Sequence, residues 1–63
     1  MDGLSSTGRM IVLHAAELFE SALVENAGLP SDEAALLKRE FSSQLSDFIL
    51  SLKRAFPNIL KDL

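Results

Sequence analysis

Few residues of this chain have side chains suited to catalysis or metal binding, and the pair His14 and Glu17 is the first to consider. The only histidine lies three residues before the glutamate, so on a helix the two side chains share one turn. Such a pair is half of a metal or acid–base site that a second subunit would complete. The alternative is a solvated histidine beside a carboxylate. The sequence has no Glu-x-x-His spacing, which a di-iron bundle would require.

Nucleophilic, thiol and phosphate-loop chemistry has little support in the sequence. The chain contains no cysteine, which excludes disulfides and thiolate metal sites. Serine, histidine and acidic residues occur at no spacing that implies a nucleophile activated by a base. A glycine-rich phosphate loop is also absent. We therefore predict that the protein is not an enzyme and that it uses no cofactor and no metal.

A basic and hydroxyl-rich flank in the second half of the chain is a candidate RNA-backbone face. Its bases are Arg39, Lys53 and Arg54, and its hydroxyl residues are Ser42, Ser43 and Ser46. Affinity for nucleic acid comes largely from phosphate neutralisation, which a net charge of −3 opposes. No aromatic residue is interleaved on this flank for base stacking. An RNA-binding hairpin dimer is therefore an alternative function and not the one that we expect.

Two resemblances to known families bear on function. The segment 42–49, Ser-Ser-Gln-Leu-Ser-Asp-Phe-Ile, is similar to the second-helix signature of small sporulation-type aspartyl-phosphate phosphatases. This resemblance implies a regulator of a response regulator with Asp47 as its functional carboxylate. That family places Asp directly after Leu, whereas Ser46 intervenes here and turns Asp47 by about 100°. In length and hairpin pattern the whole chain also resembles plasmid-copy-number regulators of the Rop type, which implies a dimeric four-helix bundle.

A short break near the middle of the chain separates two helical segments. Gly28 suits the left-handed residue that follows a helix. Pro30 cannot extend that helix, and Ser31 or Asp32 suits the N-cap of the next one. Short connections of this kind join antiparallel neighbours, so the break predicts a helical hairpin.

The domain organisation follows from this break and from the second proline. We predict one helical hairpin over residues 8–56 between a flexible N-terminus and a short apolar C-terminal tail after Pro57. The predicted segments are the N-terminus 1–7, a first helix over about 8–27, a turn at 28–31, a second helix over about 32–56, and the tail 57–63.

Apolar residues recur every three to four positions in both segments, and strand-like alternation is absent, which predicts an all-α fold. The apolar arc covers about 180° of the first helix and about 120° of the second. We expect Phe41 beside Leu18 and Ala22, and Phe48 beside Ile11 and Ala15, because large rings then lie opposite alanines. The predicted hairpin or dimer core is Ile11, Ala15, Leu18, Phe19, Ala22, Leu37, Phe41, Leu45, Phe48 and Leu52.

The apolar arc of the first helix is wider than one neighbouring helix can cover. A chain of 63 residues also gains little from its own core, rarely more than about 3–5 kcal/mol. Either a two-fold dimer closes a four-helix bundle, or a partner protein supplies the missing helices. Further apolar residues are candidates for binding a partner: Leu13, Val24, Phe56, Ile59, Leu60 and Leu63. Alternatively, these residues form a second layer of the dimer core or a lid over the open end of the bundle.

Together these patterns favour a small non-enzymatic regulatory or adaptor protein that acts through apolar helix faces. Its expected partners are itself, as a homodimer, or another protein, as the small subunit of a complex. No apolar run approaches the roughly 20 residues of a membrane span, and the first residues lack the basic and apolar regions of a signal peptide. We therefore expect a complete small cytoplasmic protein, beginning at Met1, with no membrane partner.

Overall fold

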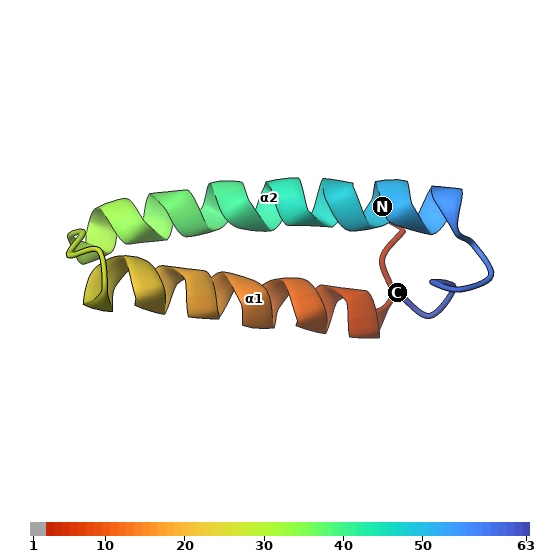
Figure 1. Ribbon diagram of the computed structural model, residues 1–63, viewed down its shortest axis with the longest axis horizontal. Helices are drawn as coiled ribbons and strands as arrows, with labels where there is room; N and C mark the ends of the chain where they lie inside the picture. Colours follow the sequence, from red (N-terminus) through yellow and green to blue (C-terminus); the bar gives the residue numbers. More distant parts are fainter. Residues whose placement is uncertain (1–2) are drawn as a thin grey trace.

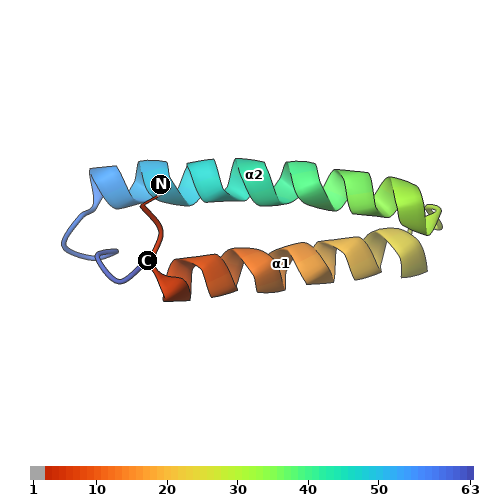
Figure 2. The same cartoon turned by 180° about the vertical axis from the view of Figure 1, so that it is seen from behind.

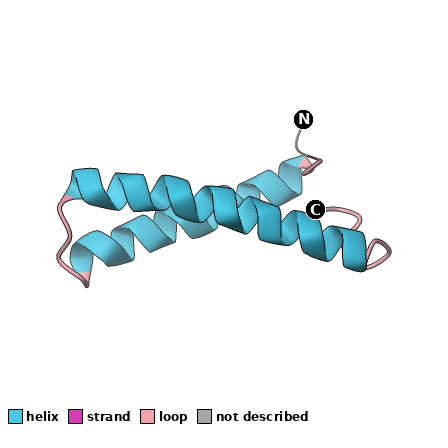
Figure 3. Cartoon of the chain, turned by 90° about the horizontal axis from the view of Figure 1, so that it is seen from above, coloured by secondary structure: helices cyan, strands magenta, loops and turns pink. Residues whose placement is uncertain are grey.

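Two antiparallel α-helices make up the part of the protein that the computed structural model describes, residues 3–63. Helix α1 spans Ser6–Glu25 and helix α2 spans Ser31–Ala55, and the two lie side by side (Figure 1, and from behind in Figure 2). Seen from above, the helices cross at an angle (Figure 3). Residues 3–63 contain no strand, so the predicted all-α helical hairpin is confirmed. The molecule is elongated, with extents of 41 × 17 × 17 Å.

The turn between the helices confirms the expected role of Gly28. Its φ of 74° lies in the left-handed region, which side chains with a Cβ rarely adopt. The N–H of Leu29 then donates to the main-chain oxygen of Leu23 at 3.0 Å and satisfies one free carbonyl at the helix end. Helix α1 accordingly ends at Glu25, two residues before its predicted end.

The start of α2 differs from the prediction by one residue. Pro30 takes the N-cap position with φ −61° and ψ 149°, and no side chain caps the helix. Proline fits here because its ring sets a suitable φ and because its missing N–H is not needed. Neither Ser31 nor Asp32 is therefore the N-cap; Asp32 instead accepts a hydrogen bond from the N–H of Glu33 at 3.0 Å. Both carboxylates lie in the first turn, where the helix dipole favours negative charge.

The C-terminal tail returns to the start of α1 (Figure 1). Ser5 is the N-cap of α1, and its hydroxyl oxygen accepts from the N–H of Gly8 at 3.2 Å. The Ser5 N–H donates to the main-chain oxygen of Leu63 at 2.6 Å, and the Ser5 hydroxyl donates to that of Asp62. Of the segment 1–7, expected to be flexible, Leu4 is buried, Ser5 caps α1, and residues 6–7 belong to α1. Residues 1–2 lie outside the described part.

The core of the hairpin lies between the first half of α1, with the residues just before it, and the second half of α2. Its buried members are Leu4, Val12 and Ile49, with Leu45, Leu50 and Leu63 packed against them. Ala16 and Ala34 are fully buried, and small residues at such positions let two helices approach closely. Towards the turn, the rings of Phe19 and Phe41 stack with centroids 4.5 Å apart and planes 16° from parallel.

The predicted pairing of the two stripes is wrong in its rotation. Phe41 stacks on Phe19, whereas Leu18, which was expected beside Phe41, is 65% exposed. Phe48 is 59% exposed instead of lying in the seam, and its neighbour Ile49 is buried. Both helices are thus turned so that only one half of each apolar stripe faces the other helix. The seam passes through the buried small residue Ala16, and a small residue at such a position permits close approach of the two backbones.

Candidate functional site

The two helices have matching flanks on each side of the hairpin. Arg9 and Leu13 of α1 line one shallow cavity together with Ser42 and Ser46 of α2. These four residues therefore face the same side of the molecule. On each helix, a second flank lies on the other side of the line of contact between the helices. The residues on these two second flanks therefore face the opposite side of the molecule.

That other side is apolar, and we call it the shared apolar face. Its residues are Ile11, Ala15, Leu18 and Ala22 of α1, and Leu37, Phe41, Phe48 and Leu52 of α2. Each of them is exposed or half-buried in the single hairpin. On helical wheels drawn at about 100° per residue, no charged residue of α1 or α2 falls within the sectors that these eight residues span. All eight were predicted as hairpin or dimer core; the other two predicted residues, Phe19 and Leu45, are half-buried in the seam.

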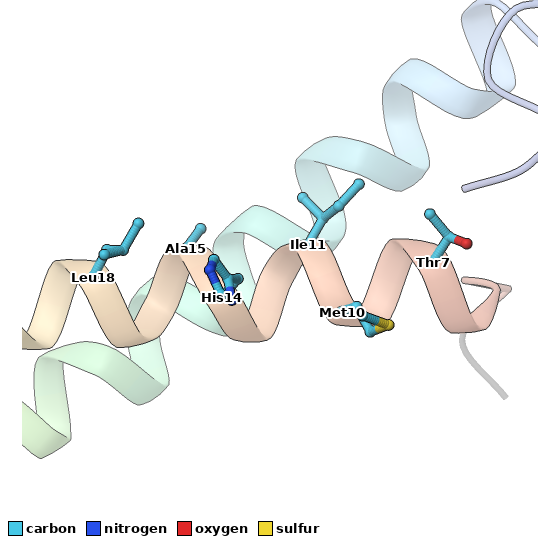
Figure 4. Close-up of a pocket in the computed structure, with 6 residues that line it drawn as sticks. All are labelled: Thr7, Met10, Ile11, His14, Ala15 and Leu18. Carbon is cyan, nitrogen blue, oxygen red and sulfur yellow. The ribbon is translucent and has the colours of Figure 1, made fainter.

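A groove runs along the α1 half of this face and has a volume of about 500 Å³. Ile11, Ala15 and Leu18 point to the same side of α1, while His14 and Met10 project from the adjoining flank (Figure 4). Large contiguous apolar patches on a protein surface mark interaction sites. The groove and the rest of the face therefore form the candidate site.

One cluster of charged residues lies on the side of the hairpin away from the shared apolar face. The ammonium of Lys38 lies 3.2 Å from a carboxylate oxygen of Glu20 and 3.4 Å from one of Glu17. The hydrogen bond that Lys38 donates to Glu20 raises the pKa of Lys38 above its ordinary value of 10.5, desolvation opposes that rise, and Glu17 adds to it. A charged side of this kind stays hydrated, so the contrast leaves the shared apolar face as the surface with most to gain from being covered.

The His14 and Glu17 pair does not form a local site. His14 is exposed at the edge of the α1 groove, and the Glu17 carboxylate is paired with Lys38 instead. In residues 3–63 there is no group of three or more histidine, cysteine, aspartate or glutamate side chains that could hold a metal ion.

The basic residues singled out in the sequence do not converge on one patch. The ammonium of Lys53 donates to the main-chain oxygen of Gly3 at 2.8 Å and so joins α2 to the N-terminal segment. Arg39 and Arg54 are exposed, but their positions lie about 22 Å apart along α2. Asp47, the carboxylate indicated by the phosphatase resemblance, is exposed on α2. No observation on these residues adds to the RNA or the phosphatase hypothesis.

The six candidate partner-binding residues outside the stripes divide into two groups. Leu60 and Leu63 are half-buried, and Leu63 packs against the core cluster as a lid over the open end. The residues that remain exposed are Leu13, Val24, Phe56 and Ile59.

Sequence reasoning missed the contribution of the first residues to the core. Leu4 is buried although it precedes α1, and Gly8 is buried beneath the tail. The signal was present in the sequence, because Leu4, Gly8, Val12 and Ala16 recur every four residues and continue the row that faces α2. The row was overlooked because Gly8 has no side chain to mark it as apolar.

Comparison with known proteins identified no related protein. No protein-family model, no curated protein and no solved structure matches the chain. Within the described residues, neither helix combines the length and the hydropathy needed to cross a membrane.

Proposed function

We propose that this chain is a small, non-enzymatic, cytoplasmic regulatory or adaptor protein that acts by protein–protein interaction through its shared apolar face. The observation that carries the proposal is that both helices expose large apolar side chains on one side of the hairpin, with Leu18 and Phe48 more than half exposed. A surface of this kind gains free energy when another protein covers it. The occupant is either a second copy of the chain or a subunit of another protein.

Site-specific photo-cross-linking in the producing cell tests this proposal. A benzophenone amino acid is placed at position 48 on the shared apolar face and, as a matched control, at position 36. Leu36 is 61% exposed, and its helical-wheel position points away from α1. We expect position 48 to trap one defined protein, itself or another, and position 36 to trap none. Equal trapping from the two positions, or no trapping from either, would contradict the proposal.

A further inference from the structure

We infer that the occupant of the shared apolar face is a second copy of this chain, so that two hairpins pair face to face in a two-fold four-helix bundle. The inference rests on the proposed function, because it names the partner for the same surface. Its support comes from exposed area, from overall shape and from the distribution of large and small residues between the two helices.

The exposed area of the single hairpin is larger than a monomer of its mass should show. The chain exposes 4640 Å², whereas a folded monomer of 6.9 kDa exposes about 4000 Å². The excess of about 600 Å² approaches the roughly 800 Å² that each partner buries in a stable interface of standard size. One pairing event on one face of standard size therefore buries an area comparable with this excess.

The shape of the hairpin leads to the same stoichiometry. Its radius of gyration is 13.2 Å, compared with about 10.6 Å for a compact domain of this length. Two such hairpins packed at the usual interaxial distance of about 10 Å would together have a radius of gyration of about 14 Å. A compact single domain of twice the length has nearly the same value, about 14 Å. Pairing therefore converts an elongated hairpin into a body of ordinary compactness.

Large and small residues are divided between the two helices in a self-complementary way. On the shared apolar face, α1 carries Ala15 and Ala22, whereas α2 carries Phe41 and Phe48. A two-fold axis parallel to the helices places α1 of one copy over α2 of the other. In the register shown by the stacked rings of Phe19 and Phe41, Phe48 then lies level with position 12 of the second copy. That level falls between Ile11 and Ala15 on the shared apolar face, where the small side chain of Ala15 leaves room for the ring.

The self-pairing is tested by sedimentation equilibrium of the full chain over a wide range of micromolar concentrations. We expect a mass twice the 6.9 kDa of the monomer, and a melting temperature that rises with protein concentration. Leu18→Glu should raise the dissociation constant of the dimer by about 100-fold or more, because the dimer contains the change twice. Leu36→Glu, which places the same charge on a similarly exposed leucine off the face, should leave the dimer intact.

Each outcome separates the inference from the proposed function. If Leu18→Glu is a folded monomer, or is unfolded while Leu36→Glu is a folded dimer, self-pairing on this face is supported. A folded wild-type monomer whose melting temperature is independent of concentration overturns self-pairing. In that case a cross-link from position 48 to another protein still upholds the proposed function. Dimers that persist equally in both variants overturn the assignment of this face.

Discussion

Gly8 gives the sharpest test of how the tail holds the hairpin closed. Glycine inside a helix is normally replaced by alanine with a gain of about 1 kcal/mol. Here a Cβ on residue 8 would meet the main-chain oxygen of Leu63 at less than the 3.0 Å that such contacts require. The tail would have to withdraw by about 1 Å to restore van der Waals contact. We therefore expect Gly8→Ala to destabilise the full chain, against the helix propensity.

The magnitude follows from the contacts that the displaced tail loses. The Ser5 N–H and hydroxyl bonds to Leu63 and Asp62 contribute about 1 kcal/mol each. Partial exposure of the Leu63 side chain, which packs on the core cluster, costs about 1 kcal/mol more. After the gain in helix propensity is subtracted, Gly8→Ala should lower the free energy of unfolding by about 1–2 kcal/mol. That is a large fraction of the roughly 3–5 kcal/mol available to a core of this size.

Urea unfolding followed by circular dichroism, at one fixed protein concentration, measures this loss. The decisive comparison is a chain that ends at Leu60, in which both tail acceptors are absent. In that shorter chain Gly8→Ala should stabilise by about 1 kcal/mol, because only the propensity term is left. The sign of the effect thus reverses between the two backgrounds. If Gly8→Ala stabilised the full chain, or had the same sign in both, the packing of the tail over residue 8 would be refuted.

Three further predictions concern the dimer, the charged side and the turn. A mixture of Ala15→Phe and Phe48→Ala chains should form a heterodimer with a higher melting temperature than either variant alone. Only in the mixed dimer does each of the two contacts between positions 15 and 48 bring one large ring against one alanine. Equal melting temperatures of the mixture and the separate variants would contradict the pairing. The two glutamates raise the pKa of Lys38. The ion pairs of Lys38 therefore contribute fully to the free energy of unfolding below pH 10.5, and this contribution is lost as the pH rises through the folded-state pKa. Lys38→Met should therefore flatten the alkaline decline of the unfolding free energy, and Lys61→Met should not. Gly28→Ala should cost about 1 kcal/mol in urea unfolding, through backbone strain alone, because nothing lies within 4 Å of a Cβ at that position; an unchanged midpoint would count against the positive φ.

Much of the fold could be predicted because its signals are local. The helical periods, the positive φ of Gly28 and the helix stop at Pro57 depend on neighbours within a few residues, which is the range over which backbone preferences act. The helix ends were displaced by one or two residues: Ser5 was only one of three possible caps, with Ser6 and Thr7, and the cap position of Pro30 was not anticipated. The eight residues of the shared apolar face were all identified as apolar core candidates.

The rotation of each helix about its own axis could not be predicted in the same way. An apolar arc of about 180° on α1 permits several seams of similar burial, and the prediction chose the seam that contains Phe48. The structure uses the seam through Ala16 and Ile49 and leaves the other half of the arc as an outer face. That choice depends on how closely two backbones approach and on which residues meet across the hairpin, so it is a property of the pair and not of either helix.

The sequence by itself determined that the chain forms two helices, where the turn lies, and that the apolar surface exceeds what one hairpin can bury. These properties are sums over local residue preferences and composition, so they can be read along the chain. Only the tertiary structure decided which apolar residues lie inside the hairpin and which form its outer face, and that the tail returns over Gly8 to the N-cap at Ser5. The tail contact joins residues more than fifty positions apart, and both features arise only when the helices have packed at a particular distance and rotation.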